Sequence, residues 1–413
     1  MADKAEGMLG PYRVLDLTDE KGLLCGKILG DLGADVIKVE RPGGDTTRNL
    51  GPFYKDEPHP EKSLFWFSYN TSKRGITLDI ESAEGQDIFR QLVKGADFVI
   101  ESFPPGYLEK IGLGYTALEK LNPGIILVSI TPFGQTGPYR DYKTADIVAW
   151  AMGGEMIPFG DTDHPPTRIS HHSQAYLHAG ADAAAGAMTA LYQRWSTNQG
   201  QQVDVSIQEA VVNCTEHVTS SWDLKHINLS YGRWPDPGHE LTRLWPCKDG
   251  YVSWFFWGGP MSHSNVPLVE LMKSKGMADD FLLNFDWTKY DAKTTQQEIG
   301  QMEEPTAKFF LAHTKAELFQ GALEYGVQLY PVSTPSDMMS SPQLAARNFW
   351  QKVEHPELGA TLTYPGPFAA TEVEPPRISR RAPLIGEHNQ EIYEGELNIS
   401  PEKLSTLKQT GVI

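Results

Sequence analysis

The sequence predicts a two-domain α/β protein whose larger domain contains a mostly parallel β-sheet. Its 413 residues exceed what one ordinary hydrophobic core holds, so two domains are expected. Through residues 12–207, short apolar runs alternate with segments of helical periodicity. Such alternation is typical of strands joined by right-handed helical crossovers, which make the strands parallel and cover both faces of the sheet.

Six apolar segments of the N-terminal half have the composition of buried strands. They are YRVLDL (12–17), DVIKVE (35–40), GITLDI (75–80), DFVIES (97–102), IILVSIT (125–131) and VDVSI (203–207). After the first segment, Leu24, Ile28 and Leu32 recur at helical spacing and predict a helix. A second helix is expected over residues 83–96, with Ser82 as its N-cap.

The composition changes near Trp222. Five of the ten tryptophans lie between Trp222 and Trp257, where Gly and Pro separate short aromatic strands. We therefore predict a small domain over residues 221–331, inserted into a large domain formed by residues 1–220 and 332–413. Within the C-terminal part, we expect a helix over residues 336–349 and then an extended, proline-rich segment (364–389) lying over the large domain.

Charge and cysteine usage limit the possible partners and locations. The formal net charge of −17 disfavours nucleic acid, since phosphate binding needs a basic face. Cys25, Cys214 and Cys247 lie far apart without CxxC spacing, which fits a reducing cytoplasm better than a disulfide framework or a zinc site. Neither a membrane-spanning apolar run nor a signal peptide is recognisable. A soluble, cytoplasmic protein is expected.

Two loops are candidates for binding an anionic ligand. In open parallel sheets, ligands bind beyond the carboxyl ends of the strands. ERPGGDTTR leaves one such end with Arg41 and Arg48, and ESFPPGYLEK leaves another with Ser102, Phe103 and Lys110. Backbone N–H groups, a guanidinium and a stacking ring suit a nucleotide; ordinary connecting turns are the alternative. Neither GxGxxG nor GxxxxGK[ST] occurs, which disfavours a standard dinucleotide or P-loop site.

A helix rich in small residues is predicted over residues 175–195. His178 and Asp182 share one face of it and could form a hydrogen-bonded pair, but two side chains are too few for a metal site. Gly180, Gly186 and the alanines favour a simpler interpretation, in which the helix packs closely against its neighbours. No Ser-His-Asp or Cys-His arrangement follows from the spacing.

Several ordered motifs resemble those of the class III coenzyme A transferases, the relatives of formyl-CoA transferase and carnitine-CoA transferase. They are YRVLDLTDEKG, ILGDLGADVIKVERPGGDTTR, NTSKRGITLDIESAEG, ADFVIESFPPGYLEKIGLGYTALEKLNPGIILVSITPFGQTGPY, GQQVDVSIQEAV and APLIGEHN. The resemblance covers nearly the whole chain. It implies a Rossmann-like large domain with a parallel sheet built from both chain ends, a smaller central α+β domain, and an interlocked dimer.

The resemblance also implies a substrate and its binding residues. Coenzyme A or an acyl-CoA would lie over the ligand edge of the sheet, without a metal. The residues at its adenine and phosphate end would be Arg41, Leu78, Ser102, Phe103 and Lys110. Ser102 stands where the family usually has Asn, which puts that contact in doubt.

In the family, an aspartate attacks the donor thioester and carries CoA as an aspartyl thioester. Counting back from Gly200 without gaps places Gly180 and Gly186 on the family's glycines and Tyr176 at the aspartate position. A phenol with a pKa near 10 and no carbonyl carbon cannot replace a carboxylate. Asp182, the nearest carboxylate, lies six residues further along.

The chain therefore resembles the subunit without the catalytic Asp in heteromeric members such as succinyl-CoA:(R)-benzylsuccinate CoA-transferase. Its partner would be a paralogous catalytic subunit, in a heterodimer or heterotetramer. The resemblance implies succinyl-CoA as donor and an aromatic dicarboxylic acid as acceptor, and the aromatic small domain is compatible with an aromatic acceptor. Two alternatives remain: a competent homodimer that uses Asp182 or Glu155, and a CoA-binding protein without turnover. The related racemases fit less well, because they also have an acid at the position of Tyr176.

Overall fold

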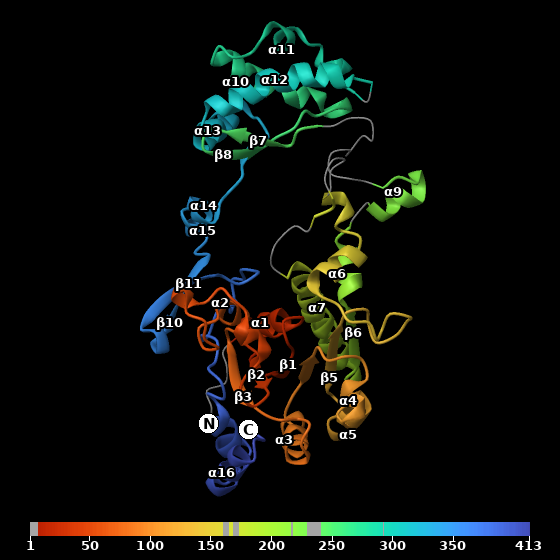
Figure 1. Ribbon diagram of the computed structural model, residues 1–413, viewed down its shortest axis with the longest axis vertical. Helices are drawn as coiled ribbons and strands as arrows, with labels where there is room; N and C mark the ends of the chain where they lie inside the picture. The colour runs from red at the N-terminus through yellow and green to blue at the C-terminus, as the bar shows by residue number, and fades with distance from the viewer. Residues whose placement is uncertain (1–6, 160–164, 168–172, 216–217, 229–240, 292) are drawn as a thin grey trace. The chain divides into compact units, whose positions relative to one another are not determined.

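The computed structural model describes residues 7–159, 165–167, 173–215, 218–228, 241–291 and 293–413. The chain divides into two compact units (Figure 1). Unit 1 comprises Met1–Glu155, Arg168–Glu216 and Ala345–Ile413, and unit 2 comprises Met156–Thr167 and His217–Leu344. Among the described residues, no helix combines the length and apolarity needed to cross a membrane.

Unit 1 is built around a six-stranded sheet in which every neighbouring pair is parallel. The spatial order is β3-β2-β1-β4-β5-β6. The strands are β1 (Arg13–Leu17), β2 (Asp35–Glu40), β3 (Lys73–Thr77), β4 (Phe98–Glu101), β5 (Ile126–Thr131) and β6 (Gln202–Ser206). The predicted α/β class with a parallel sheet is confirmed. Because the order reverses between β1 and β4, the topological switch point lies at their carboxyl ends.

The C-terminal part of the chain reinforces the β3 edge without adding a strand. The expectation of a sheet built from both chain ends was therefore wrong: its strands all lie between Arg13 and Ser206. At the β3 edge, His388 donates its backbone N–H to the carbonyl of Gly75, and Asn389 binds Thr77 through its side chain. β3 also ends earlier than predicted, because Asp79 donates its N–H to the carbonyl of Val412 instead of a strand.

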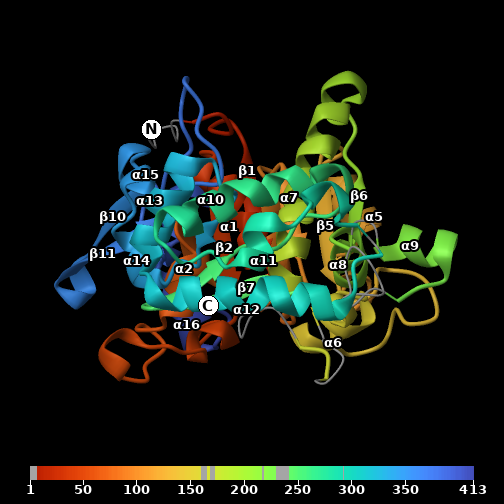
Figure 2. The ribbon, with the colours of Figure 1, turned by 90° about the horizontal axis from the view of Figure 1, so that it is seen from above.

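Helices cover both faces of this sheet. On one face, α3 (Ala83–Val93), α5 (Tyr115–Leu121) and α16 (Pro401–Gln409) share a buried core with the strands. Ser82 caps α3 as predicted, accepting a hydrogen bond from the N–H of Gly85. On the other face, α1 (Leu23–Asp31) and α7 (Gln174–Thr197) lie side by side, with α7 running along β5 and β6 (Figure 2).

The small residues of α7 permit close packing, as the sequence suggested. A Cβ atom added at Gly180 would stand 3.0 Å from the Leu24 Cβ, and one at Gly186 would stand 2.8 Å from a methyl carbon of Val203. Both distances are shorter than ordinary van der Waals contacts, so α1 and β6 approach the α7 backbone itself.

The remaining elements of unit 1 are short. They are η1 (Thr46–Asn49), η2 (Tyr54–Asp56), α2 (Leu64–Tyr69), α4 (Tyr107–Lys110), α6 (Asp146–Met152), α8 (Ile207–Asn213), β10 (Trp350–His355), η7 (Pro356–Leu358), β11 (Ala360–Pro365) and the π-helix η8 (Glu391–Glu396). The proline-rich segment runs over unit 1 as predicted. In it, the carbonyl of Pro383 accepts hydrogen bonds from Trp66 and Arg48.

Unit 2 combines a small antiparallel sheet with helices. The strands are β7 (Leu244–Cys247), β8 (Gly250–Ser253) and β9 (Tyr330–Pro331). The helices are η3 (Ile157–Phe159), α9 (Val218–Lys225), η5 (Gly259–Asn265), α10 (Val266–Ser274), α11 (Asp280–Asn284), η6 (Trp287–Lys289), α12 (Gln296–Ala312), α13 (Lys315–Tyr325) and α14 (Pro335–Met339). Trp245 and Trp254 are buried with Phe310 in its core, so much of the aromatic cluster is structural.

The helix predicted over residues 336–349 is interrupted. α14 ends at Met339, and α15 (Pro342–Ala346) begins after Ser341. Pro342 has no N–H to donate to the preceding turn and disfavours a helical conformation at the residue before it. One continuous helix therefore becomes two short ones.

Candidate active site

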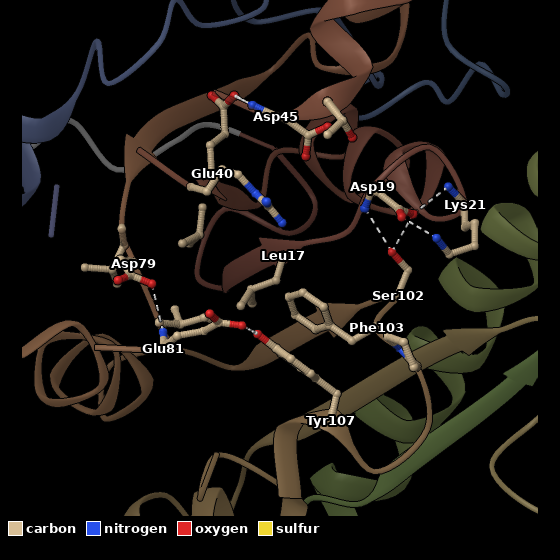
Figure 3. Close-up of a pocket in the computed structure, with 16 residues that line it drawn as sticks. Leu17, Asp19, Lys21, Glu40, Asp45, Asp79, Glu81, Ser102, Phe103 and Tyr107 are labelled. Atoms are coloured by element: carbon tan, nitrogen blue, oxygen red, sulfur yellow. Dashed lines mark hydrogen bonds and ion pairs between the residues drawn. The ribbon is translucent and has the colours of Figure 1, made fainter. Parts of the chain in front are cut away.

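A cavity of about 430 Å³ lies at the carboxyl ends of β1, β2, β3 and β4 (Figure 3). Its volume is within the range of about 300–1,000 Å³ typical of small-molecule sites. The lining residues follow the four strand ends and are Leu17, Asp19, Lys21, Val39, Glu40, Arg41, Asp45, Thr46, Leu78, Asp79, Ile80, Glu81, Ser102, Phe103, Pro104 and Tyr107. Ligands of open α/β sheets bind at this kind of switch point.

Of the five residues expected to bind the ligand, the structure brings Arg41, Leu78, Ser102 and Phe103 together around this cavity. Lys110 does not line it; this residue is exposed at the last position of α4.

The two arginines of the β2 loop have different environments. Arg41 is exposed, and its side chain forms no hydrogen bond or ion pair with any residue that the structure describes. Arg48 is fully buried and makes a bidentate pair with Glu40, at 2.7 and 2.8 Å, and a second pair with Glu61 at 2.8 Å. Arg41 is consequently the guanidinium available to a ligand, and Arg48 is a structural residue.

Ser102 is bound to the loop that follows β1. Its hydroxyl donates to Asp19 Oδ1 at 2.8 Å and accepts the backbone N–H of Asp19 at 2.9 Å, while Lys21 pairs with the other carboxylate oxygen (Figure 3). This bridge joins the carboxyl ends of β1 and β4. The hydroxyl of Ser102 is thereby engaged within the protein.

A buried charge cluster contacts the start of the loop that follows β1. Lys73 Nζ lies 2.8 Å from Asp16 Oδ2, and Lys38 Nζ lies 3.7 Å from Asp16 Oδ1 while donating to the carbonyl of Thr18. All three charged side chains are fully buried. Burial alone would raise the pKa of Asp16, but the two ammonium groups outweigh it and hold that pKa below its usual value. The cluster thus links the end of β1 to Lys38 within β2 and to Lys73 at the start of β3.

Two stacked aromatic rings form another wall of the cavity. The ring centroids of Phe103 and Tyr107 are 4.6 Å apart at an interplanar angle of 30°. Tyr107 donates its hydroxyl to Glu81 at 2.6 Å (Figure 3). Burial, this hydrogen bond and the charge of Glu81 raise the pKa of Tyr107 to about 12. A flat ligand group could stack on this pair.

The cavity wall carries five carboxylates and two cationic side chains. Glu40 is neutralised by Arg48, Asp19 by Lys21, and Asp45 lies 3.6 Å from buried Lys38. Asp79 and Glu81 are therefore the carboxylates of the wall without an ion-pair partner among the described residues, and Arg41 is the corresponding cation. The sequence analysis missed Lys21, Asp79, Glu81 and Tyr107. Asp79 lies inside the last predicted residues of a strand and the other three follow closely behind predicted strands, which was the available signal.

Tyr176 lies in the first turn of α7 and is 3% exposed. Its backbone N–H lies 3.3 Å from Asp146 Oδ1. Burial raises the pKa of the phenol, and the nearby carboxylates of Glu20 and Asp146 raise it further. The tyrosine therefore stays protonated at neutral pH. Glu20, which precedes α1, was also missed from the sequence.

Asp182 and His178 lie further along α7. Asp182 is exposed; partial burial raises the pKa of its carboxyl and the charge of His178 opposes that effect. His178 stacks on Trp150 at 5.8 Å, and its Nδ1 lies 3.4 Å from the sulfur of Cys214. No hydrogen bond joins His178 to Asp182 among the described residues, so the pair suggested by their spacing is not formed.

The Cys214–His178 contact was not foreseen. Burial and the charges of Glu155 and Asp182 raise the pKa of the Cys214 thiol, which disfavours a nucleophilic thiolate. Glu155 itself is buried. Within the described ranges, no three His, Cys, Asp or Glu side chains are grouped so that they could hold a metal ion.

Comparisons with known proteins agree with one another. Residues 9–389 match the model of the family described as CoA-transferase family III. The BbsE subunit of succinyl-CoA:(R)-benzylsuccinate CoA-transferase from Thauera aromatica is 37% identical, over 92% of each chain. The succinyl-CoA–D-citramalate CoA-transferase of Chloroflexus aurantiacus is 34% identical, over 98% of each chain. A solved structure of a CAIB/BAIF family protein from Brucella suis has a TM-score of 0.80 at 26% identity, covering 94% of this chain and 99% of that one.

Proposed function

The chain belongs to CoA-transferase family III, and from that premise we propose that it is the subunit of a heteromeric CoA-transferase that lacks the nucleophilic carboxylate. Members of this family transfer CoA and use CoA thioesters as substrates. The single observation that carries the proposal is Tyr176, buried in the first turn of α7, at the position where the motif spacing expects the aspartate.

Tyr176 cannot perform the family's covalent step. The nucleophile must attack a thioester and then carry CoA on its own carbonyl carbon, which a phenol does not have. The phenol is also protonated, because burial and the neighbouring acids raise its pKa. The tyrosine side chain is almost completely buried among protein atoms, and we propose that it occupies space that an acyl group would need in a catalytic subunit.

We place the adenine and phosphate end of CoA in the cavity of unit 1. Phe103 and Leu78 would contact the base, and Arg41 would pair with a phosphate as the free guanidinium of the wall. Lys110, exposed beyond the wall, could reach only a ligand group that extends out of the cavity. Ser102 would act indirectly, by holding the β1 loop through Asp19.

In the assembly, the carboxylate of the partner would carry the chemistry. Its attack on the donor acyl-CoA gives a mixed anhydride and CoA thiolate, and the thiolate then attacks the enzyme carbonyl to give an enzyme–CoA thioester and the free donor acid. The acceptor carboxylate attacks that thioester, and the released thiolate takes the acceptor acyl group from the second anhydride. The BbsE relative supports succinyl-CoA as donor and an aromatic dicarboxylic acid as acceptor.

An apolar surface of unit 1 supports a protein partner. On α6, Ile147, Val148 and Met152 are 45%, 40% and 39% exposed, and Tyr139 and Tyr142 are exposed on the preceding loop. Exposed apolar side chains grouped in this way are typical of protein interfaces. We propose a paralogous catalytic subunit as the occupant, in an interlocked heterodimer or heterotetramer. The three unpaired thiols support a cytoplasmic location.

A homodimer that uses Asp182 or Glu155 is less well supported. Six residues along a helix correspond to about 9 Å of rise and a turn of about 240° around the axis, so Asp182 points away from the direction of Tyr176. Glu155 is buried and lies close enough to Cys214 to act on its thiol. A protein that binds CoA without turnover in any assembly is the alternative outside enzymes.

Trapping the covalent intermediate tests the missing nucleophile. The isolated chain is incubated with succinyl-CoA and digested, and its peptides are searched by mass spectrometry for a CoA or succinyl adduct and for its release by hydroxylamine. We expect no adduct, because neither Tyr176 nor Asp182 provides a suitably placed carboxylate. The control is the same incubation with the Asp182→Asn variant. An adduct on Asp182 that this variant loses would refute the proposal and favour the homodimer.

A further inference from the structure

Glu101 ends β4 two residues before Phe103, which belongs to the aromatic wall of the cavity, and is 4% exposed. Its Oε2 accepts the backbone N–H of Phe103 at 2.7 Å, which fixes the residue that carries the stacking ring. The hydroxyl of Ser129, its register partner on β5, donates to the same carboxyl group. Glu101 therefore links the centre of the sheet to the ligand-facing loop.

Few charges surround this carboxylate. Its register partner on β1 is Leu17, which is uncharged, and Ser129 on β5 is neutral. From α4, Glu109 opposes its ionisation, and from the loop after β1, Lys21 favours it. Lys21, however, is already paired with Asp19. Burial is the largest effect; it outweighs both hydrogen bonds and raises the pKa of Glu101 to about 7.

We propose that Glu101 is a positioning residue whose protonation is coupled to the ligand: it holds Phe103 through the backbone N–H and takes up a proton when an anionic ligand binds. The ligand class is a phosphate-bearing molecule such as CoA, and in this respect the inference rests on the proposed function. Phosphates placed at Arg41 bring negative charge to a cavity whose wall already carries Asp79 and Glu81. A neutral Glu101 reduces the total negative charge in this low-dielectric region.

The direction of the pH dependence follows from linkage. An anion in the cavity raises the pKa of Glu101 further, so the complex binds more protons than the free protein between the two pKa values. Affinity for the anion must then fall as pH rises above about 7. One coupled proton limits the slope to about tenfold per pH unit.

Glu101→Gln separates this role from a purely structural one. Glutamine keeps a carbonyl oxygen that can accept the Phe103 N–H, but it cannot titrate. Glu84→Gln is the matched control, since it removes the same charge from an exposed position on α3 outside the cavity. The 3′-phosphate of CoA itself titrates near pH 6, but that contribution is common to all three proteins.

The test measures the dissociation constant of CoA by titration calorimetry from pH 6.5 to 8.5, in buffers of different ionisation enthalpy, for the wild type and both variants. We expect the wild type and Glu84→Gln to take up a proton and to lose several-fold more affinity with rising pH than Glu101→Gln. Parallel pH profiles for wild type and Glu101→Gln would overturn the coupling. Absence of CoA binding by the wild type at every pH would instead count against the proposed CoA site itself.

A measurement without ligand tests the titration of Glu101 even if the Glu101→Gln variant does not bind CoA. Because the folded-state pKa of Glu101 is raised, its ionisation opposes folding as pH rises from about 4.5 towards 7. The melting temperature of Glu101→Gln should therefore rise relative to that of the wild type as pH increases over this window, whereas the melting temperature of Glu84→Gln should not. A constant difference across the window would show that Glu101 does not titrate as described and would refute the proposal.

Discussion

Among single residues, Tyr176 is the one on which the proposed function depends most. The phenol is buried beside Glu20 and Asp146, which come from the loop after β1 and from α6. An aspartate placed there would add a further carboxylate to an acidic group, and its ionisation would be opposed. The surroundings of Tyr176 therefore favour a neutral side chain at this position.

Restoring the acid should consequently not restore activity. Tyr176→Asp removes a buried ring and leaves a cavity, and we expect a loss of unfolding free energy of roughly 3–5 kcal/mol, as for other large-to-small aromatic substitutions. The variant should remain inactive as an isolated chain. Tyr176→Phe, which keeps the ring, should stay near wild-type stability. Denaturant titration and a CoA-transfer assay measure both effects, and turnover by Tyr176→Asp alone would show that the rest of the site is intact.

Arg41 is the second residue whose proposed role, a contact with a phosphate of CoA, can be tested by a single substitution. Removing a charge-assisted phosphate contact should weaken CoA binding by roughly 1–3 kcal/mol in Arg41→Ala, measured by titration calorimetry. Lys110→Ala is the matched control, since its side chain lies outside the cavity wall and should contribute less. Equal dissociation constants for Arg41→Ala and wild type would mean that Arg41 does not face the ligand.

At the scale of elements, the strands were predictable and the contacts that select site residues were not. The apolar runs were recognisable because both faces of a parallel sheet are buried. Arg41 and Arg48 leave the same strand, and the sequence could not show that Arg48 would meet Glu61 and Pro383, which lie 13 and 335 residues away. The strand predicted at GITLDI ends at Thr77 in the structure, because Leu78 and Ile80 are apolar without belonging to a strand: both are buried in the hydrophobic core beside the cavity.

The attachment of the C-terminal segment to β3 should depend on pH. Nδ1 of His388 accepts the N–H of Gly75, which requires a neutral ring, and burial lowers the pKa of this histidine. Because the folded pKa is depressed, the stabilisation is complete above about pH 6.5 and is lost as pH falls below that value. Hydrogen–deuterium exchange of residues 382–397, corrected for intrinsic rates, should show this loss of protection.

His388→Asn provides the comparison, since its amide oxygen can accept the same N–H without titrating. Protection in this variant should change little between pH 7.5 and 5.5. His263→Asn, an exposed histidine of unit 2, should behave as the wild type does. Equal pH dependence in wild type and His388→Asn would contradict the account of this contact.

At the scale of the whole molecule, the cavity and Tyr176 both belong to unit 1. Under the proposed function, the CoA site is therefore built from this chain and the nucleophile comes from the partner. The family and the α/β fold could be inferred from the sequence, because several motifs occur in the expected order. The acidic neighbours of Tyr176 could not, since Glu20 and Asp146 reach it only through the packing of separate elements.

Reconstitution of activity tests the central claim most directly. The chain is purified alone, and again after co-expression with a paralogous family member that carries the aspartate, and each sample is assayed for CoA transfer from succinyl-CoA to a panel of aromatic and aliphatic dicarboxylic acids. The control replaces the partner's aspartate with asparagine. We predict activity only in the complex with the intact partner. Transfer by this chain alone would contradict the account, as would activity that survives loss of the partner's aspartate.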